Sequence, residues 1–119
     1  MADELSLQIV ATLTNGELDV RFAPGAKQYD QTTQGSIDQV VTVNTSAAET
    51  ISFGDISTPG FCFVRNLDPS NYVTLSSTGG AFSRVEAGEI GGWRLDPSMT
   101  LSAQADTAAC KVQFVILSD

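Results

Sequence analysis

Residues 111–117, Lys-Val-Gln-Phe-Val-Ile-Leu, constrain the fold of this chain more than any other stretch. β-Branched and aromatic residues fill the run, and this composition is typical of a strand. A run this apolar has to be buried on at least one face, so we expect it to lie centrally in a sheet. Residues 61–110 repeat the pattern, with short apolar runs separated by Gly, Pro, Asp, Asn and Ser. This spacing favours strands joined by turns.

The N-terminal region carries the strongest local signal for a β-hairpin. In residues 5–13 apolar and other side chains alternate at the period of a half-buried strand. Asn15-Gly16 follows, and Asn-Gly between two such runs favours a tight turn because both turn positions require positive φ. We expect the return strand to point Leu18, Val20 and Phe22 into the core.

The rest of the chain reads as further short strands within a single domain of residues 1–119. Residues 23–36 are polar and contain Pro24-Gly25, which predicts a loop or arm. No segment has helical periodicity, so we predict an all-β fold. The expected form is an antiparallel β-sandwich, jelly-roll-like, with about eight or nine strands. Strands beyond the first hairpin are predicted at residues 37–44, 49–56, 61–64, 72–76, 82–86, 90–95, 99–105 and 109–117.

The charge balance is strongly acidic and argues against several partners. The 119 residues contain 14 acidic and 6 basic side chains and no histidine, for a net charge of −8. Nucleic acid and anionic lipid attract clustered cations, and the six here are scattered. We therefore expect no nucleic-acid partner and no membrane partner. An acidic surface would suit a basic partner.

Catalysis is not expected, nor is a bound metal or cofactor. Without histidine, the usual serine and cysteine nucleophiles lack their general base. No Cys-x-x-Cys spacing exists for zinc. Cys62 and Cys110 each lie in an apolar run, where a cysteine behaves as a small hydrophobic residue. The N-terminus has no signal-peptide pattern, so we expect synthesis in a cytoplasm and reduced, buried thiols. A disulfide between them is the alternative if their strands face each other.

Other motifs have simpler structural interpretations than functional ones. Asp68 opens a Pro-Ser-Asn turn and is expected to cap it, since the acid spacing of a calcium loop is missing. Glu86 and Glu89 are expected to straddle a turn and not to form a glycosidase pair. Trp93 is expected to anchor a core or an interface, with sugar stacking as the alternative.

One pattern calls for a partner. If Val112, Phe114 and Ile116 fill the core, Val115 and Leu117 point out of the sheet and need cover from another layer, a loop or another subunit. Residues 61–64 pose the same problem, so we expect a homo-oligomer. The candidate interface residues are Val115, Leu117, Phe61 and Trp93.

The second half of the chain resembles a group of small β-sandwich virion proteins of tailed bacteriophages. The residues that carry the resemblance are Phe63-Val64-Arg65-Asn66-Leu67-Asp68 running into Asn71-Tyr72-Val73, then Ala87-Gly88-Glu89, Arg94-Leu95, Ala103-Gln104-Ala105-Asp106-Thr107-Ala108-Ala109 and the final Ile116-Leu117-Ser118-Asp119. The resemblance covers about the last 60 residues. It implies a jelly-roll or similar sandwich, made in the host bacterial cytoplasm, that trimerises and sits on the virion. The implied role is a capsid decoration or cement protein bound to the major capsid protein. The pattern marks scaffold positions, so it transfers no site residue.

Two other classes stay open. A tail or baseplate component would share the fold but bind a tail protein or a host surface. A carbohydrate-binding module would be monomeric and would use Trp93, Tyr72 or Tyr29 as an exposed platform.

Overall fold

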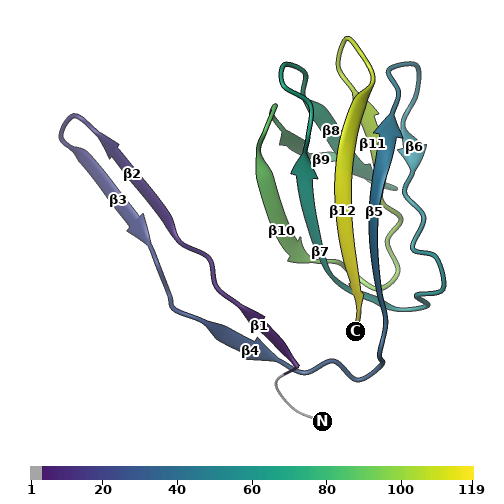
Figure 1. Cartoon of the computed structure of the whole chain (residues 1–119), viewed down its shortest axis with the longest axis horizontal. Coiled ribbons are helices and arrows are strands. Elements are labelled where there is room, and N and C mark those ends of the chain that lie inside the picture. Colours follow the sequence, from purple (N-terminus) through teal and green to yellow (C-terminus); the bar gives the residue numbers. More distant parts are fainter. Residues whose placement is uncertain (1–3) are drawn as a thin grey trace. The chain divides into compact units, whose positions relative to one another are not determined.

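The computed structural model describes residues 4–119, which form twelve strands and no helix (Figure 1). The prediction of an all-β fold is confirmed, with more strands than the about eight or nine that turn spacing suggested. The described chain divides into two compact units, one ending at Thr33 and one comprising Gln34–Asp119. The sandwich that we expected over residues 1–119 is therefore confined to the second unit.

The first unit, residues 4–33, is a hairpin in two paired sections, and we call it the arm. β1 (Leu5–Leu7) pairs antiparallel with β4 (Lys27–Tyr29), and β2 (Ala11–Asn15) pairs antiparallel with β3 (Leu18–Phe22). The predicted hairpin is confirmed, but its two turn residues are Gly16 and Glu17, one position later than expected. Gly16 has φ of +60°, a conformation that glycine adopts without strain.

Two expectations for this region are wrong. Residues 23–36 are not one loop, because residues 27–29 form β4; Lys-Gln-Tyr has no alternation, and its partner β1 sets the pairing. The return strand does not point into a core either. Leu18, Val20 and Phe22 share one face, as their alternation predicted, but all three are exposed.

The second unit is a sandwich of two four-stranded sheets (Figure 1). One sheet has the order β10-β7-β12-β5 and the other β6-β11-β8-β9. β12 lies between β7 and β5, so the prediction of a central C-terminal strand is confirmed. The strands are β5 (Ser36–Val43), β6 (Glu49–Thr50), β7 (Pro59–Asn66), β8 (Val73–Ser77), β9 (Gly80–Val85), β10 (Ile90–Arg94), β11 (Ser102–Ala105) and β12 (Cys110–Ser118).

The order of these strands is that of a jelly roll. Within Gln34–Asp119 there are eight strands, and the first and last, β5 and β12, are neighbours in one sheet. The second and the seventh, β6 and β11, are neighbours in the other. This arrangement wraps an eight-stranded antiparallel ribbon into two sheets. The predicted jelly-roll-like sandwich is confirmed.

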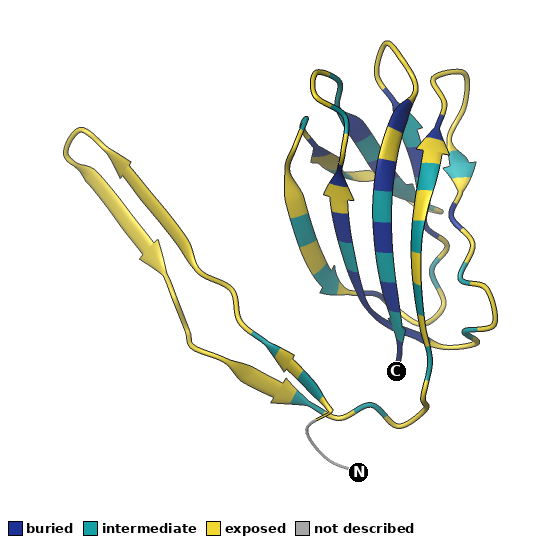
Figure 2. Cartoon of the chain, viewed as in Figure 1, coloured by how far each residue is buried: buried dark blue, intermediate teal, exposed yellow. Residues whose placement is uncertain are grey.

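The core lies between the inner faces of the two sheets. Along β12 buried residues alternate with more accessible ones, as Figure 2 shows. Phe114 and Ile116 are fully buried, which confirms the predicted face assignment of this strand. Burying one such side chain contributes about 1.5–3 kcal/mol. The other fully or nearly buried apolar residues are Val43, Ile51, Cys62, Val64, Val73, Leu75, Val85, Leu95, Leu101, Ala103, Ala105, Cys110 and Val112.

The weak strand expected at residues 49–56 is much shorter in the structure. Only β6 pairs in a sheet, and residues 51–56 form a loop. Gly54 adopts φ of +59°, and the Ile56 N–H donates to the Phe53 carbonyl at 3.1 Å. Ile51 is nevertheless buried and anchors the loop to the core.

Candidate functional site

The hairpin formed by β2 and β3 has one apolar side. Cross-strand pairing places Leu13 opposite Val20 and Ala11 opposite Phe22, with Leu18 beside the turn. All five side chains lie on the same side, because residues two apart in a strand share a face. We call this side the arm face.

The arm face is open to solvent. Val20 is 49 % exposed and Phe22 is 56 % exposed, and Figure 2 shows exposed residues along both strands. Ile9 and Val10, just before β2, are exposed as well. An isolated two-stranded hairpin is marginally stable in water. A contiguous exposed apolar surface on such an element marks an interaction site.

The sandwich carries a second apolar surface on the sheet β10-β7-β12-β5. Its inner side packs on the other sheet, and its outer side is formed by the alternate residues. Val115 lies opposite Phe63, and Gln113 lies opposite both Arg65 and Val40. Val40 is 57 % exposed. We call this surface the outer sheet face, and its apolar members are Val40, Phe61, Phe63, Ile90, Val115 and Leu117.

Two phenylalanines form a flat patch on the outer sheet face. The rings of Phe61 and Phe63 are stacked, with centroids 6.1 Å apart and planes 5° apart. A Cβ atom at Gly92 would overlap the ring of Phe63, so glycine makes room for this ring. The Arg94 guanidinium lies 4.5 Å from the centroid of the Phe61 ring and also pairs with Asp119 at 3.0 Å. Phe61 is only 9 % exposed, and Phe63 is half-buried.

Basic side chains border this patch. Arg94 lies near one end of the face, and Arg65 and Lys111 lie near the other. These are three of the six cations in the chain. On the β5 side, the Gln113 side-chain amide donates to Asp38 at 2.9 Å. Aromatic residues and arginine together are typical of protein–protein interfaces.

The structure brings three of the four predicted interface residues together. Phe61, Val115 and Leu117 all lie on the outer sheet face. Trp93 does not, and this is a correction. It lies opposite Cys62 in the register, and both face the sandwich interior. Strand alternation therefore puts it on the side opposite Phe61.

Trp93 packs half-buried against the core near the open edge formed by β10 and β9. Its ring meets the Phe82 ring edge-on, with centroids 5.8 Å apart. Its indole N–H is buried and has no hydrogen-bond partner among residues 4–119. Of the other aromatic residues named for the alternative sugar platform, Tyr29 lies in the arm, and Tyr72 has the Arg84 guanidinium over its ring at 3.6 Å.

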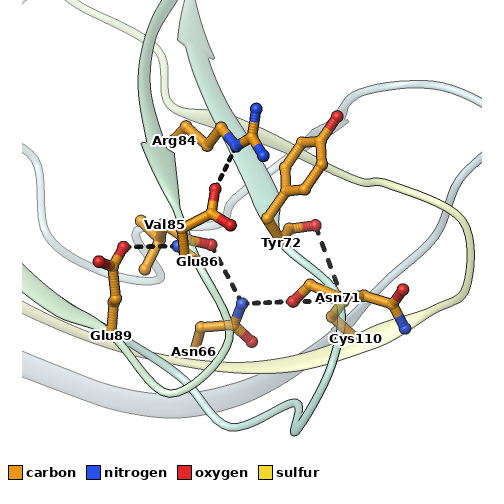
Figure 3. A network of polar contacts seen from close by, with 8 residues as sticks. All are labelled: Asn66, Asn71, Tyr72, Arg84, Val85, Glu86, Glu89 and Cys110. Atoms are coloured by element: carbon orange, nitrogen blue, oxygen red, sulfur yellow. Dashed lines mark hydrogen bonds and ion pairs between the residues drawn. The ribbon is translucent and has the colours of Figure 1, made fainter.

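A buried asparagine joins three segments at one end of the sandwich (Figure 3). The Asn66 side-chain amide donates to the carbonyls of Asn71, at 2.9 Å, and Val85, at 3.1 Å. Its side-chain oxygen accepts from the Asp68 N–H at 3.0 Å. Asn66 is one of the residues that carry the phage resemblance, and its role is to hold the scaffold together.

The two acidic turn motifs have the structures predicted for them. Asp68 accepts hydrogen bonds from the N–H groups of Asn71, at 2.7 Å, and Ser70, at 3.0 Å. These bonds lower the pKa of Asp68. The Glu89 N–H donates to the Glu86 carbonyl, and the Glu86 N–H donates to the Glu89 carboxylate. Both motifs are capped turns.

Four loops gather at this end of the sandwich (Figure 1). Hydrogen bonds join them, among them Ala105 N–H to Asn44 at 2.9 Å and Asp106 N–H to Tyr72 at 3.1 Å. Acidic side chains are concentrated here. We call this region the acidic loop end, and its acidic residues are Glu49, Asp68, Glu86, Glu89 and Asp106.

The two cysteines are buried and are not joined in a disulfide, as predicted. They lie on neighbouring parts of the core but pair with different residues, Cys62 with Ile116 and Cys110 with Val43. Burial raises the pKa of the Cys62 thiol to about 12. Burial, and after it the nearby Asp68, also raises the pKa of Cys110.

Among residues 4–119, no three His, Cys, Asp or Glu side chains lie close enough to hold a metal ion. The described chain also has no helix of the length and apolar character needed to cross a membrane.

Sequence reasoning missed the arm face and the exposed ends of the outer sheet face. Leu18, Val20 and Phe22 were expected in the core, because alternation identifies side chains that share a face but does not show what covers that face. The exposed positions of Val40 and Ile90 were not predicted, although Val40 is three positions from the buried Val43 on its strand and Ile90 is three positions from the half-buried Trp93. Ile90 is 78 % exposed.

Comparison with protein-family models and with curated proteins found no match.

Proposed function

We propose that this chain is a structural protein of a tailed-bacteriophage virion that binds the assembled head and stabilises it as a capsid decoration, or cement, protein. The observation that carries the proposal is the arm, whose apolar face is exposed on a hairpin too small to be stable by itself. Contact with other subunits in an assembly would bury the apolar face of such an element. The resemblance of residues 63–119 to small virion sandwich proteins indicates that this assembly is a phage particle. Jelly rolls are also frequent in viral structural proteins.

The mechanism would be mechanical, with no turnover of a substrate. A homotrimer seated over the junctions between capsid subunits adds contacts that must break before the shell opens. Ligands that bind only the intact state stabilise it by mass action, by about 2.7 kcal/mol at a concentration 100 times the dissociation constant. The shell would therefore open at a higher temperature when the protein is bound.

The acidic loop end is the surface that we expect to meet a basic region of the major capsid protein. It brings together Glu49, Asp106 and three further carboxylates. The net charge of −8 points the same way. Exposed charges lose most of their attraction at about 1 M salt, where the Debye length is roughly 3 Å. Binding through this end would accordingly weaken as salt rises.

The test is to add purified protein to phage particles that lack it and to measure the temperature at which they release their genome. We expect binding to heads and a rise in this temperature. Asp106→Lys should weaken binding because it reverses a charge in the acidic loop end. Asp55→Lys is the matched control, since the same charge change lies in the loop after β6.

Electron microscopy of the same particles separates the remaining classes. Density on heads supports the proposal. Binding only to tails would replace it with a tail or baseplate role, and a monomer that binds sugars and no particle would replace it with a carbohydrate-binding role.

A further inference from the structure

We propose that the arm face of one copy of this chain packs on the outer sheet face of a second copy, so that copies assemble by exchanging arms. The inference deepens the oligomeric part of the proposed function by naming the two surfaces in contact. It rests on the proposed function only for the number of copies, which is three.

The arm needs a partner that covers one side only. Leu13, Val20 and Phe22 lie on the arm face, whereas the pairs Thr12–Arg21 and Thr14–Asp19 make the other side polar. The polar side of such a hairpin is stable in water, whereas exposure of its apolar side to water is unfavourable. The occupant must therefore offer a flat apolar surface, as a sheet does.

The outer sheet face matches the arm face in shape. β2 and β3 have five residues each and span about 17 Å, whereas β7 and β12 have eight and nine residues and span about 26–30 Å. Two sheets pack face to face about 10 Å apart when their side chains interdigitate. The half-buried Phe63 ring and the neighbouring Val115 provide the apolar centre for such a contact, and the exposed Val40 lies on the same face.

The turn of the arm and one end of the outer sheet face carry opposite charges. Glu17 lies at the turn of the hairpin, and the outer sheet face carries Arg65 and Lys111 near the acidic loop end. A docked arm whose turn points toward that end would place Glu17 beside these cations. Opposite charges at an interface fix the register of the contact and suppress the reverse orientation.

The number of residues in the contact favours an assembly in which every copy uses both of its surfaces. Standard interfaces use about 20–30 residues a side. One hairpin supplies the twelve residues from 11 to 22, which is too few. In a head-to-tail ring each copy gives its arm to one neighbour and receives an arm from the other, so every copy buries both its arm face and its outer sheet face, although each pairwise contact contains one arm. Because the two surfaces differ, the contact is head-to-tail, and such contacts form a closed ring when the rotation permits.

Two pairs of substitutions test the surfaces in the full-length protein by light scattering. Val20→Asp and Val115→Asp should each raise the dissociation constant by about tenfold or more, because a buried charge replaces a central apolar contact. Thr12→Asp, on the polar side of the arm, and Thr74→Asp, on the outer side of the other sheet, are the matched controls and should leave the oligomer intact. If Val115→Asp does not fold, Val40→Asp replaces it, since Val40 is exposed.

A charge reversal tests which residues meet. Glu17→Arg and Arg65→Glu should each weaken association, and the double variant should restore it at least in part. Asp19→Arg makes the same charge change on the polar side of the arm and should have no effect. Failure of the double variant to recover any association would overturn the proposed orientation.

The inference is overturned by a 12.6 kDa species at micromolar concentration or by an oligomer that survives both Val20→Asp and Val115→Asp. A monomer whose arm is protected from hydrogen exchange would show docking within one chain and would also overturn it. These outcomes are distinct from failure of the proposed function. Monomers that bind heads would refute arm exchange alone, and oligomers that bind no particle would refute the virion role alone.

Discussion

The arm and the sandwich are built from strands with the same alternation, yet only one of them has a core. Val20 in the arm and Val112 in β12 are the same residue type in the same kind of pattern. Val20 is 49 % exposed, and Val112 is fully buried. The difference shows that alternation specifies which side chains share a face, whereas cover for that face comes from other parts of the chain or from other chains.

In the sandwich, the apolar faces are buried because strands far apart in the sequence pair with each other. β12 lies between β5 and β7, although about 70 and 50 residues of chain separate them. Two sheets assembled this way bury each other's inner faces. In the arm β2 pairs with β3 across a turn and β1 pairs with β4, so the arm forms a single layer.

The largest effect on the free energy of unfolding should come from a large-to-small substitution in the sandwich core, and not from one in the arm. Phe114→Ala removes a fully buried ring and should lower the free energy of unfolding by about 3–5 kcal/mol. Leu13→Ala in the arm should change it by about 0.5 kcal/mol or less, because the site is exposed. Urea unfolding of both variants, at a concentration where the protein is monomeric, measures the contrast. Equal losses would mean that the arm has a core of its own.

A second effect should appear at high pH and should come from the sandwich, where both cysteines lie. Burial raises the pKa of Cys62 from 9.0 to about 12. Below pH 9 the thiol is protonated in both states, and between pH 9 and 12 only the unfolded chain loses the proton. The free energy of unfolding should therefore fall by up to about 1.4 kcal/mol per pH unit in this range.

Cys62→Ala tests this pH effect, because it should flatten the fall between pH 9 and 12 relative to the unsubstituted protein. Phe22→Ala in the arm should leave the slope unchanged and serves as the control. An identical slope with and without Cys62 would show that other groups cause the loss.

Much of the sandwich could be predicted because its signals are local and strong. The apolar run at residues 111–117, the buried cysteines and the turn at Asp68 all have the structures expected of them. These features depend on composition and on turn chemistry, which a single sequence displays directly. The outward position of Val115 followed from the same alternation.

Three features could not be predicted, each for a physical reason. β4 has only three residues and depends on its partner β1 for pairing. The face of Trp93 was hidden because Gly91 and Gly92 give β10 no alternation to read. The exposure of Val20 could not be predicted, because alternation does not show which contacts cover a face.

The central claim is that the sandwich is complete in one chain and that the arm is completed by a second copy. Hydrogen–deuterium exchange on the full-length protein, followed above and below the dissociation constant, tests it most directly. We predict that the amides of β12 stay protected at both concentrations, because this strand is central to a covered sheet. The amides of residues 11–22 should be protected only in the oligomer. Equal protection of residues 11–22 at both concentrations would contradict the claim, as would their exchange in an intact oligomer.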